Sequence, residues 1–262
     1  MNGLSNINIE LTSRCNKECW CCGRRKRERE DPTVKDSYGD MRFELLQTIA
    51  KQVPPNIVVQ LHNNGEPLLY PRFVGAVKLF PNQITSIDTN GKLLLERGCD
   101  VVDKLDTIAI SVIENDPEAD EQYEIIRRFL NLKGHFKPLV VLRLNGSIDR
   151  KRYECFGVPI ATRILHSPMG SFDYTKKVNV PEIGICMDLL HHLSIDRYGN
   201  VSICVRFDPE GKGIIGNVNE NSLQDIWEGD LRKEWIEQHK KGNRKNAPLC
   251  SNCDFWGLPT CS

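Results

Sequence analysis

Short apolar runs recur along about the first 165 positions of this chain, and amphipathic stretches separate them. Nearly continuous apolar runs are typical of strands that are buried on both faces of a parallel sheet. We therefore expect six strands, over residues 7–11, 57–61, 84–87, 107–113, 139–144 and 162–165. Apolar residues at helical spacing predict intervening helices over 42–53, from about 71 to 79, over 92–97 and from 117 to about 134. The charged stretch 24–41 is expected to be an exposed connection.

The number of strand–helix units limits the fold class. A closed eight-unit barrel needs about 250 residues, whereas six units occupy the alternating part of this chain. We predict an α/β fold in which a partial (β/α)6 barrel spans residues 1–166 and a smaller domain spans residues 167–262. The smaller domain should contain a β-hairpin around Tyr198-Gly199-Asn200 and a helix that begins at Ser222.

Polar and cysteine-rich segments follow each predicted strand of the barrel. The active edge of such a sheet lies at the carboxyl ends of its strands. A cysteine loop follows the first strand, Gly65-Glu66-Pro67 the second and Thr89-Asn90-Gly91 the third, while Ser111 and Arg143 lie at or near the ends of the fourth and fifth. These segments should meet on one rim, which is where we expect an active site.

Charge and hydropathy exclude several classes of partner. The formal net charge is zero, which argues against a general binder of nucleic acid or of membrane surfaces. The longest apolar runs are too short to span a bilayer. The first residues carry no charged-then-apolar signal pattern, so we expect a cytoplasmic protein with no membrane partner.

Eleven cysteines are many for a cytoplasmic protein, where thiols stay reduced and clusters of them indicate metal or redox chemistry. Cys15, Cys19 and Cys22 lie on one short loop with the spacing C-x3-C-x2-C. A [4Fe–4S] cluster normally takes four cysteines, so three would leave one iron open for chemistry. A zinc site remains an alternative from this loop alone.

The loop and the later Gly65-Glu66-Pro67 turn together resemble the radical S-adenosylmethionine (radical SAM) enzymes, whose fold is a six-unit partial barrel. The resemblance implies that the three loop cysteines hold a [4Fe–4S] cluster and that Gly65, Glu66 and Pro67 bind the amino group of S-adenosylmethionine. It also suggests Ser111 and Arg143 as contacts for the ribose and the carboxylate. One departure is Cys21, since the family commonly has an aromatic or large apolar residue at that position.

In that family the reduced cluster cleaves S-adenosylmethionine to a 5′-deoxyadenosyl radical, which abstracts a hydrogen from the substrate. The resemblance therefore implies S-adenosylmethionine as cosubstrate and an external one-electron donor such as flavodoxin or ferredoxin. It assigns no catalytic residue. His62, His166 and Asp208 lie in segments that face the expected cavity, but lone groups of this kind are more often structural, and we give them no catalytic role.

A second set of thiols lies in the smaller domain: Cys186, Cys204, Cys250 and Cys253. The sequence alone permits structural zinc or a [4Fe–4S] cluster here. The spacing is similar to the auxiliary-cluster domain called SPASM, in its shortened twitch form. That implies one auxiliary [4Fe–4S] cluster with all four irons ligated, suited to moving an electron. Cys261 does not match the continuation that a second auxiliary cluster needs.

Three functions follow from these patterns. The first is oxidation of a small polar alcohol, with the auxiliary cluster as electron acceptor, as in radical SAM dehydrogenases that act on a secondary alcohol. The second is a radical SAM maturase that modifies a peptide. The third, of another class, is a non-catalytic metal-binding module, which predicts zinc in place of iron. A nucleic-acid-modifying enzyme is disfavoured by the neutral charge.

Overall fold

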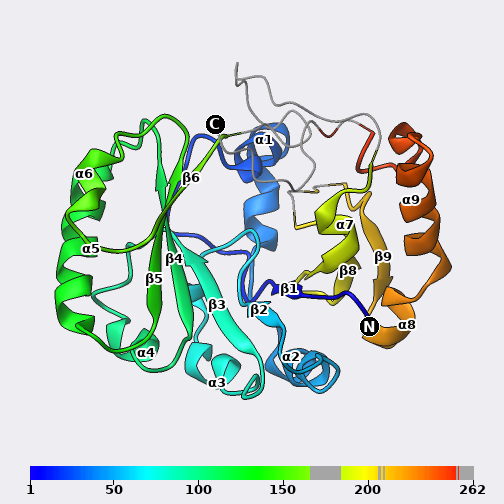
Figure 1. Ribbon diagram of the computed structural model, residues 1–262, viewed down its shortest axis with the longest axis horizontal. Coiled ribbons are helices and arrows are strands. Elements are labelled where there is room, and N and C mark those ends of the chain that lie inside the picture. Colours follow the sequence, from blue (N-terminus) through cyan, green and yellow to red (C-terminus); the bar gives the residue numbers. More distant parts are fainter. Residues whose placement is uncertain (166–183, 206–207, 209, 252, 254–262) are drawn as a thin grey trace.

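A computed structural model describes residues 1–165, 184–205, 208, 210–251 and 253 of the chain, and in this part nine strands form one sheet (Figure 1). Their order across the sheet is β6-β5-β4-β3-β2-β1-β7-β8-β9. The strands are β1 (Asn6–Ile9), β2 (Val58–Gln60), β3 (Ile84–Thr89), β4 (Thr107–Ile113), β5 (Leu139–Asn145), β6 (Ile160–Arg163), β7 (His192–Ile195), β8 (Asn200–Ser202) and β9 (Ile214–Asn217).

The first six strands are parallel and lie side by side in chain order. Within the described residues the sheet stays open, with β6 at one edge and β9 at the other. Helices α5 and α6 cover the β4–β6 end, and α8 and α9 lie at the opposite end (Figure 1). The predicted partial barrel of six strand–helix units is therefore confirmed. β1 and β4 are largely buried on both faces, as continuous apolar runs predict, whereas β5 alternates and β6 is mostly exposed.

The helices are α1 (Gly23–Glu30), α2 (Phe43–Ala50), α3 (Phe73–Val77), α4 (Gly98–Val101), α5 (Ala119–Lys133), α6 (Lys151–Glu154), α7 (Met187–His191), α8 (Leu223–Trp227) and α9 (Asp230–Lys240), with 3-10 turns η1 (Pro32–Ser37), η2 (Pro67–Leu69) and η4 (Arg244–Asn246). Helix α5 ends at Gly134, as predicted, because this residue takes a φ of 53° that favours glycine. Among the described residues, no helix has both the length and the apolar character needed to cross a bilayer.

Most of residues 24–41 are exposed or partly exposed, as predicted, but the stretch is not an irregular connection. Helix α1 and turn η1 occupy this stretch, and Arg24 and Glu28 are buried. The Arg24 guanidinium lies 4.1 Å from the centre of the Tyr38 ring and 3.6 Å from a Glu28 oxygen, and the Tyr38 hydroxyl donates to the same carboxylate. These polar side chains are buried because they satisfy one another, which a pattern of charged residues does not reveal.

The helix expected over residues 92–97 is wrong, since this segment forms turns and α4 begins at Gly98. The side chain of Asn90 accepts a hydrogen bond from the Lys92 amide at 2.9 Å, which favours a turn over a helix. Arg97 donates to the Asp100 carboxylate at 2.6 Å and to the Leu68 carbonyl at 2.8 Å. Hydrogen bonds made by the Asn90 and Arg97 side chains, one of them to the distant Leu68 carbonyl, therefore decide the conformation of residues 92–97.

The predicted hairpin is confirmed, since β7 and β8 pair antiparallel. However, β7 also pairs with β1 in parallel register, from Asn6 opposite His192 to Ile9 opposite Ile195. The C-terminal strands thus continue the sheet of the barrel. The proposed boundary between residues 166 and 167 lies outside the described residues and stays a prediction.

Ser222 caps a helix as predicted, because its hydroxyl accepts a hydrogen bond from the Asp225 amide at 3.1 Å. The apolar residues that follow divide between two helices, α8 and α9, since the chain is extended at Gly229. A Cβ at this glycine would lie 3.1 Å from the carbonyl oxygens of Asp225 and Ile226, so the close approach of the chain needs glycine.

Two apolar clusters hold these elements together. The large one extends from the β1–β5 strands to Leu223, Ile226 and Trp227 of α8. The small one lies among the C-terminal elements and consists of Leu189, Ile203, Trp235, Ala247 and Leu249. The barrel and the C-terminal strands therefore share one core, and the second core belongs to the region around the later cysteines.

We expect Ile195→Ala to lower the free energy of unfolding by about 2–4 kcal/mol, because Ile195 is fully buried where β7 joins β1. Ile214→Ala is the matched control, since Ile214 lies on β9 and is 39% exposed, and it should cost less than about 1.5 kcal/mol. Equilibrium urea unfolding of the cluster-loaded protein measures both values. Equal losses in the two variants would contradict a shared core at the β1–β7 junction.

Candidate active site

The loop after β1 carries the first set of cysteines, and Cys15, Cys19 and Cys22 are all half-buried on it. The Cys22 amide donates to the Cys19 carbonyl at 3.1 Å, and α1 begins at the next residue. The pKa of the Cys19 thiol is raised to about 12, mainly by burial, and the neighbouring thiols of Cys21, Cys22 and Cys15 contribute to this rise. The loop therefore gathers several soft donors whose thiolates repel one another, an arrangement that binding of a cationic metal centre would relieve.

Within the described residues, no three cysteine, histidine or acidic side chains converge as they would around a single metal ion. A zinc ion needs all of its sulfurs within about 2.3 Å of one point. A [4Fe–4S] cluster takes one thiolate per iron at separate corners, so its ligands stand farther apart. The donors that the loop offers are thiols, which are the ligands that an iron–sulfur cluster takes.

A buried ion pair fastens the cysteine loop to the segment before α5. The Lys17 ammonium lies 2.5 Å from Asp116 and 3.4 Å from Glu118, and the Lys17 and Asp116 side chains are each 4% exposed. Burial alone would lower the pKa of Lys17, but the hydrogen bond from Lys17 to Asp116 and the attraction of nearby anions raise it above its usual value. Lys17 is therefore a fixed positive charge beside Cys19.

The Gly65-Glu66-Pro67 turn lies against the same loop. A Cβ at Gly65 would stand 2.0 Å from the Thr12 carbonyl oxygen and 2.7 Å from that of Arg14, so no side chain fits at this position. The Glu66 amide also donates to the Arg14 carbonyl at 2.8 Å. Close backbone contact is thus the physical reason for glycine here.

The Glu66 carboxylate joins the ends of two strands. It is 2% exposed and accepts hydrogen bonds from the Leu68 amide at 3.1 Å, the Thr89 hydroxyl at 2.8 Å and the Asn90 amide at 2.8 Å. Burial raises the pKa of Glu66, although these donors oppose the shift. The carboxylate holds the turn after β2 to the turn after β3.

The segments that the sequence placed on one rim do surround one cavity of about 230 Å³. Its lining includes Cys15, Cys19, Gly65, Glu66, Asn90 and Ser111. The described lining does not include Cys22, Pro67 or Arg143. Pro67 is buried at the start of η2, where it fixes the turn.

Arg143 forms an ion pair with Asp88, which does line the cavity. Burial lowers the pKa of Arg143 to about 9, and nearby Arg163 adds to the shift. His62 accepts a hydrogen bond from the Asp88 amide at 3.0 Å, and burial together with Arg143 lowers its pKa to about 3, so the ring is neutral. The sequence analysis missed Asp88, and the one signal for it was its place at the end of β3, just before Thr89.

The later cysteines lie around the small apolar core. Cys186, Cys204 and Cys250 pack against it. The pKa of Cys250 is raised to about 12, mainly by burial, and the adjacent thiols of Cys253 and Cys186 contribute to this rise. These four soft donors come from the residue before α7, from the residues after β8 and from the segment after α9, and they fit the thiolate set of a [4Fe–4S] cluster.

His239 of α9 is a supporting residue that the sequence analysis missed. Its side chain is 1% exposed, and Nδ1 accepts a hydrogen bond from the Cys186 amide at 3.3 Å. Burial lowers its pKa to about 4, and Arg244 adds to the shift, so the ring stays neutral and can accept. His166 and Cys261 lie outside the described residues.

Lys17→Met should lower the free energy of unfolding by about 3–5 kcal/mol, because it leaves the buried Asp116 carboxylate unpaired. The double variant Lys17→Met/Asp116→Asn should recover most of that loss. Arg150→Met is the control, since the Arg150–Glu154 pair is exposed and removing it should cost about 1 kcal/mol or less. Urea unfolding checks all three, and a double variant as unstable as the single one would contradict the buried-pair interpretation.

Gly65→Ala should displace the cysteine loop and cost at least about 1–3 kcal/mol, because the new Cβ meets backbone oxygens that cannot rotate away. The iron bound per chain after reconstitution should fall along with the stability. Gly134→Ala is the matched control: it has a positive φ but no atom within 4 Å of a Cβ, so it should cost about 1 kcal/mol and leave iron content unchanged. Full iron loading of Gly65→Ala would show that the loop tolerates the displacement.

The sequence also matches known proteins. Residues 186–254 match a family model described as SPASM, an iron–sulfur cluster-binding domain. The chain is 25% identical over 263 residues to the S-adenosyl-L-methionine-dependent 2-deoxy-scyllo-inosamine dehydrogenase of Niallia circulans, covering 98% of this chain and 95% of that protein.

Two solved structures share the fold. The structure of BtrN in complex with AdoMet and 2-DOIA has a TM-score of 0.65 at 21% identity, over 96% of this chain and 93% of the other. SuiB of Streptococcus suis, bound to the precursor peptide SuiA, has a TM-score of 0.61 at 14% identity, over 96% of this chain and 71% of the other. The domain match, the full-length relative and the shared fold agree with the expected radical SAM enzyme with a C-terminal SPASM domain, whose cofactors are S-adenosylmethionine and [4Fe–4S] clusters, one of them auxiliary.

Proposed function

We propose that this enzyme oxidises a small polar alcohol by abstracting a hydrogen atom from the carbon that bears the hydroxyl group. Cys15, Cys19 and Cys22 are the proposed ligands of the cluster that binds S-adenosylmethionine. The observation that carries this assignment is the meeting of the cysteine loop with the Gly65-Glu66-Pro67 turn at one cavity on the carboxyl edge of the sheet. We propose the twitch-type domain as residues 167–262, after a barrel of residues 1–166.

Cys21 is left out of the proposed ligand set because it lies outside the C-x3-C-x2-C spacing of Cys15, Cys19 and Cys22. The pKa values of Cys21 and Cys19 are both raised to about 12, mainly by burial, so they do not separate the two thiols. What differs is the nearest charge, since the Glu114 and Asp116 carboxylates oppose a thiolate at Cys21, whereas the Lys17 ammonium favours one at Cys19.

The proposed contacts with S-adenosylmethionine divide into three roles. The turn at Gly65 and Glu66 presents backbone groups to the amino end of the molecule, and Pro67 fixes the shape of that turn. Ser111 lines the cavity with a hydroxyl suited to a ribose. Arg143 is paired with Asp88, so its proposed contact with the carboxylate requires it to exchange that partner.

We propose Cys186, Cys204, Cys250 and Cys253 as the four ligands of the auxiliary cluster. The cluster held by Cys15, Cys19 and Cys22 would supply the electron that cleaves S-adenosylmethionine before any hydrogen atom is abstracted. After the hydrogen atom has left the alcohol carbon, the substrate radical becomes a carbonyl by losing its hydroxyl proton and one electron, which the auxiliary cluster would accept. The neutral His239 ring fixes the backbone at Cys186 without adding a charge beside the ligands. The single electron that starts the reaction is proposed to come from an external donor such as flavodoxin or ferredoxin.

The share of each relative's length that this chain matches supports a small alcohol as the substrate. The match spans 98% of this chain, so it includes the segments that carry both of its cysteine sets, and it covers 95% of the dehydrogenase relative, whose name states a 2-deoxy-scyllo-inosamine substrate. A peptide substrate is the second candidate, because SuiB shares the fold and its structure holds a precursor peptide. This chain covers 71% of SuiB, so the alcohol reaction is the better-supported of the two.

Cys22→Ala should reduce the formation of 5′-deoxyadenosine from S-adenosylmethionine to background, because it removes a proposed cluster ligand. Cys21→Ala, the adjacent thiol, is the matched control and should keep at least about half of the wild-type rate. The assay uses anaerobically reconstituted protein and dithionite. Protein that retains zinc, refuses iron and forms no product would support the non-catalytic metal-binding alternative and overturn the proposal.

Deuterium transfer separates the two substrate classes. We expect deuterium from carbon-deuterated polyols or sugar alcohols, supplied as a pool, to enter 5′-deoxyadenosine. Transfer from deuterated peptides and none from the polyols would favour the peptide-modifying alternative.

A further inference from the structure

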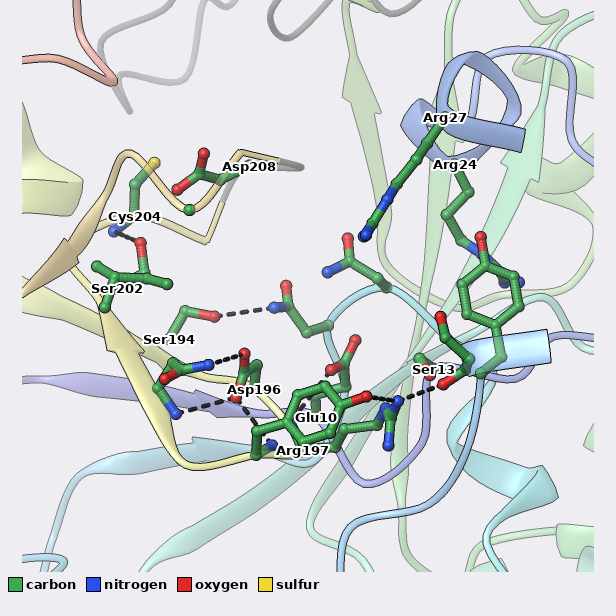
Figure 2. Close-up of a pocket in the computed structure, with 18 residues that line it drawn as sticks. Glu10, Ser13, Arg24, Arg27, Ser194, Asp196, Arg197, Ser202, Cys204 and Asp208 are labelled. Carbon is green, nitrogen blue, oxygen red and sulfur yellow. Dashed lines mark hydrogen bonds between the residues drawn. The ribbon is translucent and has the colours of Figure 1, made fainter. Parts of the chain in front are cut away.

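A second cavity, of about 300 Å³, lies between the α1–η1 segment and the β7–β8 hairpin (Figure 2). Cys204, a proposed ligand of the auxiliary cluster, lines one side of it. Asn63 lines both this cavity and the one beside Cys15 and Cys19, so the two spaces adjoin. The second cavity therefore lies between the two cysteine sets, where a molecule that exchanges a hydrogen atom and then an electron would bind.

Two carboxylates of this cavity are engaged in holding turns. Asp196 accepts hydrogen bonds from the Tyr198 and Asn200 amides, both at 2.9 Å. Asp208 accepts from the amides of Lys212 at 3.0 Å and Gly213 at 2.6 Å. The carboxylates of Asp196 and Asp208 thus already accept hydrogen bonds from backbone amides.

Two of the three arginines that line the cavity are engaged as well. Arg24 lies over the Tyr38 ring and beside the Glu28 carboxylate, as described above. Arg197 lies 3.9 Å from the centre of the Tyr198 ring and donates to the Ser37 carbonyl.

Arg27 differs from these two arginines. Across the ranges that the structure describes, its guanidinium makes no hydrogen bond and no ion pair with another residue. Figure 2 shows its side chain extending from α1 into the cavity, toward the side that carries Cys204 and Asp208. Among the described residues, Arg27 therefore lines the cavity without a direct hydrogen-bond or ion-pair partner, although its charge also acts on the Asp31 carboxylate at the end of α1.

The remaining lining is rich in neutral donors and acceptors. The Asn63 amide donates to the Ser194 hydroxyl at 3.0 Å, and Asn64 and Ser202 also line the space. Glu10 is 5% exposed, and its carboxylate accepts a hydrogen bond from the Arg197 amide at 3.2 Å. Amides and hydroxyls that can both donate and accept suit a ligand with several hydroxyl groups.

We propose that this second cavity is the substrate site, and that the substrate is a small polyhydroxylated molecule carrying one carboxylate or phosphate group that pairs with Arg27. This inference rests on the proposed function. The guanidinium presents its donors as a planar fork, which matches both anions. The amides and hydroxyls around Asn63 then orient the hydroxyl-bearing carbons between the two cysteine sets. An anionic substrate would distinguish this enzyme from the dehydrogenase relative, whose named substrate is an amine.

The test is equilibrium binding of four monosaccharides to the full, reconstituted protein with S-adenosylmethionine present and no reductant. The probes are glucose 6-phosphate, glucuronate, glucose and glucosamine, measured by isothermal titration calorimetry. We expect at least one of the two anionic sugars to bind about 10-fold or more tightly than glucose and glucosamine. The tighter of the two anionic sugars identifies whether a phosphate or a carboxylate is recognised.

Arg27→Gln should abolish this preference, whereas Arg29→Gln should keep it. Arg29 is the matched control, because it lies on the same helix and outside the lining of the cavity. A preference for glucosamine that is lost in Glu10→Gln would overturn the inference in favour of an amine-bearing substrate. Equal affinities for all four probes, no detectable binding, or an anion preference that survives Arg27→Gln would also overturn it.

Failure of this inference can be told apart from failure of the proposed function. Binding is measured without reductant and without cleavage of S-adenosylmethionine, whereas the proposed function is tested by 5′-deoxyadenosine formation in the wild type and in Cys22→Ala. A wild type that cleaves S-adenosylmethionine but shows no anion preference contradicts the substrate class alone. A wild type that binds anionic sugars but cannot form 5′-deoxyadenosine contradicts the proposed chemistry.

Discussion

The parallel pairing of β1 with strands on both of its sides is the constraint on which the rest of the structure depends. On one side β1 pairs with β2 and the barrel, and on the other it pairs with β7 and the C-terminal strands. β1, β2 and β7 are parallel, so their carboxyl ends lie at the same edge of the sheet. The loop that leaves β1 therefore lies next to both halves of the molecule, and it is the loop that carries Cys15, Cys19 and Cys22.

A buried polar framework then fixes that loop. Lys17 pairs with Asp116 before α5, and Glu66 joins the turns after β2 and β3. Burying such groups is costly unless each finds a partner, and here each one does. The result is a set of strand ends locked to one another around the cavity, so the reactive positions depend on many long-range contacts and not on the flexibility of a single loop. Such preorganisation is suited to radical chemistry, in which the reacting atoms must stay close and water must stay out.

Each of the two cavities has a separate role in the proposed reaction. The one beside Cys15 and Cys19 adjoins the turn proposed to hold S-adenosylmethionine, and the one beside Cys204 adjoins the proposed auxiliary cluster. They meet at Asn63, whose side chain also bonds to Ser194 of β7. The contact between the barrel and the hairpin is thus both a structural joint and the wall of the proposed substrate site.

The sequence by itself determined the six strands, the spacing of both cysteine sets and the placement of Gly65-Glu66-Pro67 on the same rim, because apolar periodicity and local spacing are encoded residue by residue. It did not predict that Arg24 and Glu28 are buried, that residues 92–97 form turns, or that Asp88 and His239 support the sites. Several of these features depend on partners distant in the chain. Arg97 donates to the Leu68 carbonyl 29 residues away, and His239 accepts from the Cys186 amide 53 residues away. Only the tertiary structure decided them, since whether a charged side chain is buried depends on what the fold brings beside it.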